Sequence, residues 1–162
     1  MLKITDLVQA IKPYVLNWIQ NIVWVNGSDD TYQMAVLDGR CLAFRATLNS
    51  DVSQGMVLQF SQSVDGTVEI AAANSDLPIG VAYSDGVKGQ RIWVVYNGFA
   101  QVLFKTGVTG TKGYVVYVSD TAGYADNSSS LPSTAQHNRE FAHCFKDGTS
   151  GGLAMCHISH MN

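Results

Sequence analysis

The sequence is poor in charge. Only 14% of its 162 residues are charged, against roughly 25% in average soluble chains. The net charge is −3, and the ten lysine and arginine residues form no cluster. Because electrostatic binding to nucleic acid needs a basic patch, we expect no nucleic-acid partner. A surface with so few charges is typical of a protein that is partly covered by its own copies or by another protein.

Cysteine pairs, targeting signals and long apolar runs are also missing. Cys41, Cys144 and Cys156 are odd in number and include no CxxC, so the sequence predicts no disulfide framework and fits synthesis in a reducing cytoplasm. Charged residues and Pro13 interrupt the first 25 residues, which excludes a signal-peptide core of usual length. No run of about 20 uncharged apolar residues occurs, and we expect no membrane span.

Catalytic motifs are absent as well. Glu69 and Glu140 are the only glutamates, and no spacing pairs them. The sequence holds no G-x-S-x-G, no P-loop, and no G-x-G-x-x-G between a strand and a helix. Residues 107–113, GVTGTKG, superficially resemble a phosphate loop, but they fall between two expected strands, without a helix terminus to bind phosphate. We therefore expect neither an enzyme nor a cofactor.

The first 25 residues carry a heptad pattern. Apolar residues occupy two rows spaced four-three-four-three, the a/d pattern of a helix that packs against copies of itself. β-branched residues dominate both rows, which favours three or four strands over two. The rows hold Met1, Val8, Val15 and Ile22, and Ile4, Ile11, Trp18 and Val25. We predict that residues 1–25 form an N-terminal helix for oligomerisation or anchoring, with a homotrimer interface made by Val8, Ile11, Val15, Trp18 and Ile22.

Pro13 limits the length of this helix. A proline inside a helix removes one hydrogen bond and kinks the axis, although it can also begin a second helix over 13–24. Leu16 and Ile19 lie outside the two rows, so the second half is apolar nearly all round and is expected to pack under the rest of the chain. The alternative to self-assembly is an amphipathic helix lying on its own β-sheet.

Residues 26–162 predict a β-rich head domain. Turn dipeptides containing glycine lie between runs of strand-forming residues, which is the signal of a β-hairpin. Asp38-Gly39 lies between 31–37 and 41–47, Asp65-Gly66 between 55–61 and 67–73, and Asn97-Gly98 between 90–96 and 99–104. The third hairpin signal is the clearest of all.

The remaining strands complete an all-β pattern. We expect strands at 78–83 and 113–118, and a last hairpin that joins 139–145 to 151–158. Residues 126–138 predict a polar surface loop. About nine or ten short strands favour an antiparallel β-barrel or sandwich. The runs GMVLQFS at 55–61 and GYVVYVS at 113–119 echo one another, which suggests two similar strand-turn units in one barrel.

The last hairpin also brings the only candidate metal ligands together. Two histidines and two cysteines are a zinc ligand set, and His143-Cys144 can lie opposite Cys156-His157. Adjacent residues of a strand point to opposite faces, so at most one of each pair shares a face. We therefore predict no metal site, with Cys144 and Cys156 as small buried neighbours and the two histidines exposed.

Residues 55–125 resemble a family of phage proteins. A G-apolar-V strand leads to PIGVA at 78–82, a glycine loop, a strand with Gly98, a further glycine-led strand, and a turn with Gly123. This order is similar to the small-β-barrel capsid decoration (cement) proteins of tailed phages. The resemblance implies a non-enzymatic virion structural protein that binds the outside of the assembled head, commonly as a trimer, and braces the major capsid protein. Binding only to the assembled lattice stabilises it by mass action.

The N-terminal helix departs from that barrel pattern and opens a second interpretation. A head or tail fibre, or a receptor-binding protein, would use the helix as a trimeric anchor and turn its β head toward host glycans. Aromatic residues that could contact sugars gather in the second half of the chain, while Trp93 is expected in the core. They are Tyr83, Trp93, Tyr96, Tyr114, Tyr117 and Tyr124.

Overall fold

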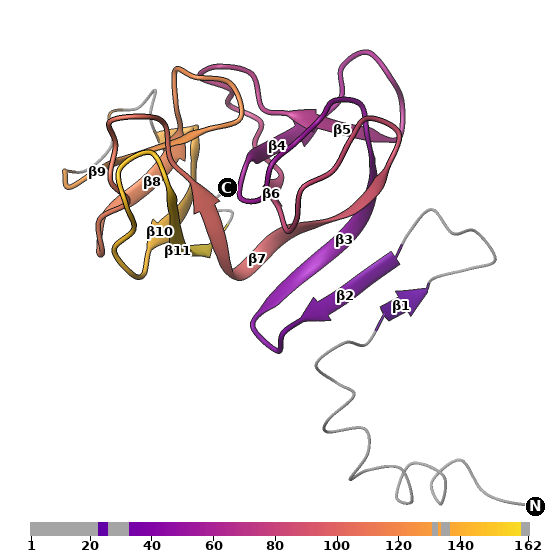
Figure 1. Cartoon of the computed structure of the whole chain (residues 1–162), viewed down its shortest axis with the longest axis horizontal. Coiled ribbons are helices and arrows are strands. Elements are labelled where there is room, and N and C mark those ends of the chain that lie inside the picture. The colour runs from indigo at the N-terminus through magenta and orange to yellow at the C-terminus, as the bar shows by residue number, and fades with distance from the viewer. Residues whose placement is uncertain (1–22, 26–32, 131–132, 134–136, 160–162) are drawn as a thin grey trace, which may run out of the picture.

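The computed structural model of the chain describes residues 23–25, 33–130, 133 and 137–159 (Figure 1). These residues include eleven strands in one hydrogen-bonded sheet, which confirms the predicted mainly-β class. The strands are β1 (Val23–Val25), β2 (Gln33–Leu37), β3 (Cys41–Leu48), β4 (Val57–Phe60), β5 (Thr67–Ile70), β6 (Gly80–Ala82), β7 (Arg91–Leu103), β8 (Val115–Val118), β9 (Ala125–Ser128), β10 (Glu140–Cys144) and β11 (Leu153–Ile158).

Five of these strands hydrogen bond in a closed ring, which we call ring 1. Its order is β3-β5-β4-β6-β7, and β7 pairs with β3 to close it. Four pairs are antiparallel, but β3 and β5 run parallel at Leu48 and Val68, so the predicted wholly antiparallel sheet is in fact mixed. Leu58 and Val94 pack with these two residues in the core of the ring. A closed ring leaves few free strand edges.

The second half of β7 continues into a second ring, ring 2. Its order is β7-β11-β10-β8-β9. A parallel bridge between Phe104 and Ala125 brings β9 back to the end of β7. Phe104, Val116 and Cys156 lie in its core. The sequence predicted one barrel, whereas the structure has two rings that share β7, with β3–β6 on one side and β8–β11 on the other (Figure 1).

The two rings repeat each other strand for strand. Each has the same order of strand directions, with one parallel contact between its first and third strands. The echo predicted from residues 55–61 and 113–119 falls on β4 and β8, which hold the same place in their rings. The loops repeat a hydrogen bond as well. The backbone amide of Gln54 donates to the Asp85 carboxylate at 2.7 Å, and the backbone amide of Lys112 donates to the Asp147 carboxylate at the same distance.

The predicted hairpin at Asn97-Gly98 is wrong. Both residues lie inside β7, a single strand of 13 residues. A type I′ hairpin turn, the type that Asn-Gly favours, needs positive φ at both central residues. Asn97 stays in the strand, and Gly98 alone has a positive φ, of 94°. Gly98 pairs with Cys41 of β3 on one side and with Ile158 of β11 on the other. These pairings on both edges keep the chain in one strand at this point instead of a turn. The irregular register beside it marks a β-bulge.

The other predicted hairpins are confirmed. Asp38 and Gly39 both have positive φ, of 52° and 62°, and join β2 to β3. β4 pairs with β5, and β10 pairs with β11. The predicted polar loop over 126–138 begins too early, because β9 reaches Ser128 and pairs with β8. No sequence signal indicated strand β9, because three of its four residues are polar and only Ala125 is buried.

The predicted helix over 1–25 falls largely outside the described residues. Its interface residues, Val8, Ile11, Val15, Trp18 and Ile22, all lie there. Its last three residues correct the prediction, because Val23–Val25 form strand β1, antiparallel to β2 with Trp24 opposite Met34. Two valines and a tryptophan favour a strand where a partner edge is free. No helix among the described residues is long and apolar enough to span a bilayer.

Candidate functional site

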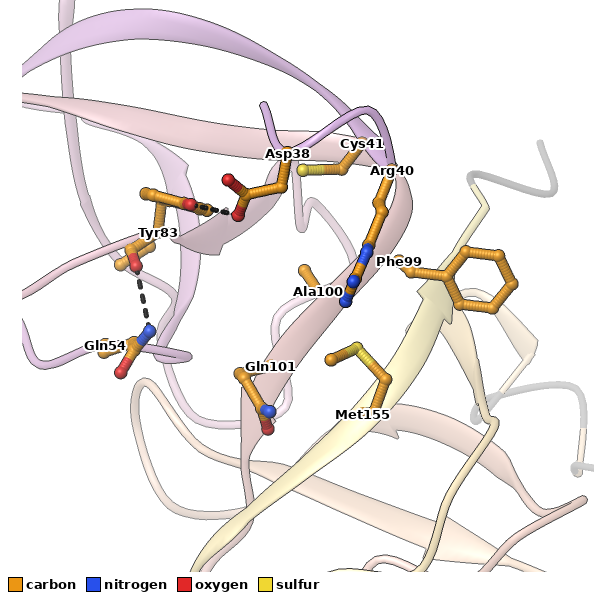
Figure 2. Close-up of a pocket in the computed structure, with 10 residues that line it drawn as sticks. Asp38, Arg40, Cys41, Gln54, Tyr83, Phe99, Ala100, Gln101 and Met155 are labelled. Atoms are coloured by element: carbon orange, nitrogen blue, oxygen red, sulfur yellow. Dashed lines mark hydrogen bonds between the residues drawn. The ribbon is translucent and has the colours of Figure 1, made fainter. Parts of the chain in front are cut away.

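A pocket opens where the β2–β3 turn meets both rings (Figure 2). We call it the inter-ring pocket. Its volume is about 220 Å³. Strands far apart in the sequence contribute to it, because β7 and β11 supply lining residues beside those of the β2–β3 turn. Its lining is Asp38, Arg40, Cys41, Gln54, Ala82, Tyr83, Phe99, Ala100, Gln101 and Met155.

One wall of the inter-ring pocket is held by a short hydrogen bond. The Tyr83 hydroxyl donates to Asp38 at 2.5 Å, and the Gln54 side-chain amide donates to the Tyr83 carbonyl at 3.2 Å (Figure 2). The hydrogen bond to the Asp38 carboxylate, helped by burial, raises the pKa of Tyr83 to about 12. The phenol is therefore protonated at neutral pH and ties the β2–β3 turn to ring 1.

The opposite wall combines a cation with amide and apolar groups. Arg40 follows the turn, and its guanidinium extends toward Gln101 and Met155 (Figure 2). The backbone carbonyl of Arg40 accepts a hydrogen bond from the Phe99 amide at 3.0 Å. Donors and acceptors thus converge on a small concave site with an apolar floor, which is the usual composition of a small-ligand site.

An aromatic platform adjoins this pocket on the outer surface of ring 2. It consists of Phe99, Phe145 and His157. The ring of Phe99 meets each of the other two edge to face, with centroids 4.9 Å apart in both pairs. Phe145 is 57% exposed. Phe99 also lines the inter-ring pocket, so the platform and the pocket share this residue.

The last hairpin places its cysteines as predicted, whereas the two histidines, predicted to be exposed, are half-buried. Cys144 pairs with Cys156 and His143 with His157 across β10 and β11. Both cysteines are buried, and burial raises the pKa of each thiol, which confirms them as inward neighbours. Among the described residues, no group of three or more His, Cys, Asp and Glu side chains is arranged to hold a metal ion.

The two glutamates belong to separate hydrogen-bond networks. Glu69 accepts hydrogen bonds from Ser61 at 2.8 Å and Asn49 at 3.2 Å, and the Ser61 contact is the main cause that lowers its pKa. Glu140 is buried, with His137 at 3.1 Å. The two carboxylates therefore lie in different rings and do not form a pair, as their separation in the sequence indicated.

An apolar face lies at the mouth of ring 1. Phe44 is its centre, with ring centroids 6.3 Å from Phe60 and 6.0 Å from Tyr96. Two shallow grooves of about 520 and 290 Å³ share Met34, Phe44 and Phe60. We define the apolar face as Met34, Val36, Leu42, Phe44, Phe60, Pro78, Ile79 and Tyr96.

Sequence reasoning missed both surfaces. In β2 and β3 almost every position is apolar, so the strands give no alternation that separates an inner from an outer face. The available signal was that Met34 and Leu42, at positions where an outward-facing residue is usually polar, are apolar. Trp93 fits its predicted place, because it packs against the core, and the Arg45 guanidinium lies 5.7 Å from its ring centroid.

Comparison with known proteins gives a structural match. No protein-family model matches the chain, and no curated protein matches it in sequence. The chain is similar to the head fibre gp8.5 N base of bacteriophage phi29, at 26% identity and a TM-score of 0.52, over 72% of this chain and 92% of that one. A weaker similarity is to a chain in the capsid of Myoviridae phage XM1, at 14% identity and a TM-score of 0.45, over 88% and 95%. The resemblance to phage virion proteins that the sequence suggested is thus confirmed.

Proposed function

We propose that the chain is a non-enzymatic structural protein of a phage head, acting as the base of a head fibre or as a decoration protein on the capsid surface. The observation that carries this proposal is the similarity to the phi29 head fibre base, which extends over nearly all of that chain. The fold supports it, because closed rings with buried cores make a rigid contact surface.

In this role the described residues form the head, and residues 1–22 form the assembly segment. The heptad rows at Val8, Ile11, Val15, Trp18 and Ile22 join three copies, and the trimer binds the capsid subunits. Three copies held together bind the lattice far more tightly than one, because later contacts are made at high effective concentration.

Binding to the assembled head is the direct test. Purified protein is mixed with heads that lack it, the mixture is sedimented, and the bound copies per head are counted by quantitative mass spectrometry. We expect saturable binding to assembled heads and none to free capsid subunits. A decoration protein reaches tens to hundreds of copies, whereas a fibre base of receptor-binding type is present at few copies. Equal binding to heads and free subunits, or none to heads, contradicts the proposal.

The trimer has its own test. Light scattering of the wild type at micromolar concentration is expected to give three times the chain mass of 17.5 kDa. Ile11→Asp with Val15→Asp places charge in the rows and is expected to leave a monomer, because a buried unpaired carboxylate costs several kcal/mol. The control pair Lys12→Asp with Gln9→Asp changes charge outside the rows and keeps the trimer. A monomeric wild type contradicts this part of the proposal.

The aromatic platform favours a second role, contact with host glycans by the same head protein. Exposed aromatic rings can stack on sugar faces, and the adjoining inter-ring pocket supplies Arg40 and Gln101 for hydroxyl groups. Binding to immobilised host-wall glycans tests it. Phe145→Ser is expected to abolish that binding, whereas Val87→Ser, which removes a similarly exposed apolar side chain from ring 1, keeps it. Equal binding by both variants rules this role out.

A further inference from the structure

The apolar face is a surface feature that neither the fold nor the proposed function uses. Phe60 is 61% exposed and Met34 is 44% exposed, and both line the same grooves at the mouth of ring 1. Leu42, on the same side of β3, is 40% exposed. Single exposed apolar residues are ordinary, but a contiguous group of this kind marks a surface that something covers.

The start of the chain lies at the edge of this face. β1 is the terminal strand of the sheet, and Trp24 is the register partner of Met34. Met34 is in turn opposite Phe44. Residue 22 therefore joins the described chain about two strand spacings, roughly 10 Å, from the centre of the apolar face.

The composition of residues 1–22 suits such a surface. Lys3, Asp6 and Lys12 are the only charged residues among them, and none follows Lys12. The heptad rows account for one side of the segment, but Leu16 and Ile19 lie outside the rows and need another partner. If residues 13–22 are helical they extend about 15 Å, enough to cross three strands.

We infer that residues 13–22 dock on the apolar face of their own chain, with Leu16 and Ile19 over Phe44, Phe60 and Met34. Covalent continuity through Val23 favours the same chain over a second copy, because a short tether corresponds to a millimolar local concentration. The inference goes beyond the proposed function and does not depend on binding to a phage head. On a helix Leu16 and Ile19 follow the row residues Val15 and Trp18 by one position, about 100° around the axis, so the heptad rows face a neighbouring side of the segment and stay available to symmetry mates.

Limited proteolysis of the full chain tests the docking. Chymotrypsin can cleave after Tyr14 and Trp18, and the cleavage rate there reports how often the segment leaves the surface. Phe60→Ser removes a docking contact, and Phe145→Ser is its matched control, because both remove an exposed phenylalanine, 61% and 57% exposed, from different rings. We expect Phe60→Ser to raise the cleavage rate at these sites about tenfold, and Phe145→Ser to leave it unchanged.

Met34→Ser serves as a second variant and is expected to act in the same direction. Intact residues 33–159 after the digest show that each variant is folded. Equal cleavage in Phe60→Ser, Met34→Ser and Phe145→Ser overturns the inference, as does wild-type cleavage as fast as in a free peptide of residues 1–22. A difference in cleavage between the wild type and Phe60→Ser that disappears on dilution assigns the face to a second copy and also overturns the inference. Head binding is measured separately, so its loss without a change in cleavage bears only on the proposed function.

Discussion

Ring 1 and ring 2 have the same order of strands and different cores. Leu48 and Phe104 hold the same position, at the end of the first strand of each ring, beside Val68 and Ala125 respectively. A large side chain faces a small one in ring 2, and two middle-sized side chains meet in ring 1. The comparison shows that the pairing pattern of a small closed sheet tolerates exchanged volumes, provided that the total volume fills the core.

The rings also differ in what surrounds them. Ring 2 has the aromatic platform on its outer surface, whereas ring 1 opens at its mouth into the apolar face. Two copies of one architecture therefore offer two kinds of contact surface.

Breaking the joint between the rings is expected to have the largest effect. A Cβ on Gly98 would lie 2.3 Å from the Arg40 carbonyl oxygen, and its φ of 94° strains any other residue. We expect Gly98→Ala to lower the free energy of unfolding by about 5 kcal/mol, since overpacking and backbone strain add. Urea denaturation measures it. Gly107→Ala, at a φ of 87° with nothing within 4 Å of the new Cβ, is the control and is expected to lose about 1 kcal/mol. Equal losses would contradict the steric account.

Truncating the equivalent core positions compares the two rings directly. Phe104 and Leu48 are both fully buried. We expect Phe104→Ala to cost about 4 kcal/mol and Leu48→Ala about 3 kcal/mol, because the larger side chain leaves the larger cavity. Thermal and urea unfolding measure both. The reciprocal exchange, Leu48→Phe with Phe104→Leu, is expected to destabilise ring 1, because a phenylalanine at position 48 would be too large beside Val68. A well-folded double exchange would show that the facing residue does not decide the volume.

The repeated loop hydrogen bond predicts equal effects in the two rings. Asp85 and Asp147 each accept one backbone amide at 2.7 Å. We expect Asp85→Ala and Asp147→Ala each to lose about 1 kcal/mol in urea unfolding, and the corresponding asparagine variants to lose less. A loss confined to one ring would mean that the repeated geometry is not matched by repeated energetics.

Tyr83 of ring 1 is expected to add its own dependence of stability on pH, which one substitution can separate from the rest. The pKa of Tyr83 is raised to about 12 in the folded chain, so the stability linked to it is fully present below its ordinary pKa of 10. That stability is lost as the pH rises from 10 through 12. Tyr83→Phe is expected to flatten the fall in stability over this interval, measured by urea midpoints. An unchanged slope would show that Asp38 does not hold the phenol.

The sequence allowed the prediction of features decided by neighbouring residues. Asp38-Gly39 forms its hairpin because both residues take positive φ locally. Asn97-Gly98 does not, because strands on both edges of β7, from Cys41 to Ile158, decide its conformation. β4 and β8 share an apolar pattern and revealed the repeat, but β5 and β9 share none.

The candidate site was beyond sequence reasoning for the same reason. The inter-ring pocket joins Asp38 to Met155, and no local pattern places these residues together. The apolar face could have been suspected from β2 and β3, where polar residues are few on both sides of the strands. The buried cysteine pair was predictable, because one hairpin with a short loop fixes its register.

Cryo-electron microscopy of the virion tests the central claim most directly. We predict density for the two rings on the outer surface of the head, in groups of three, with the N-terminal residues toward the three-fold contact between copies. Particles that lack this density, while the protein is absent from purified virions by mass spectrometry, would contradict the assignment to the phage head.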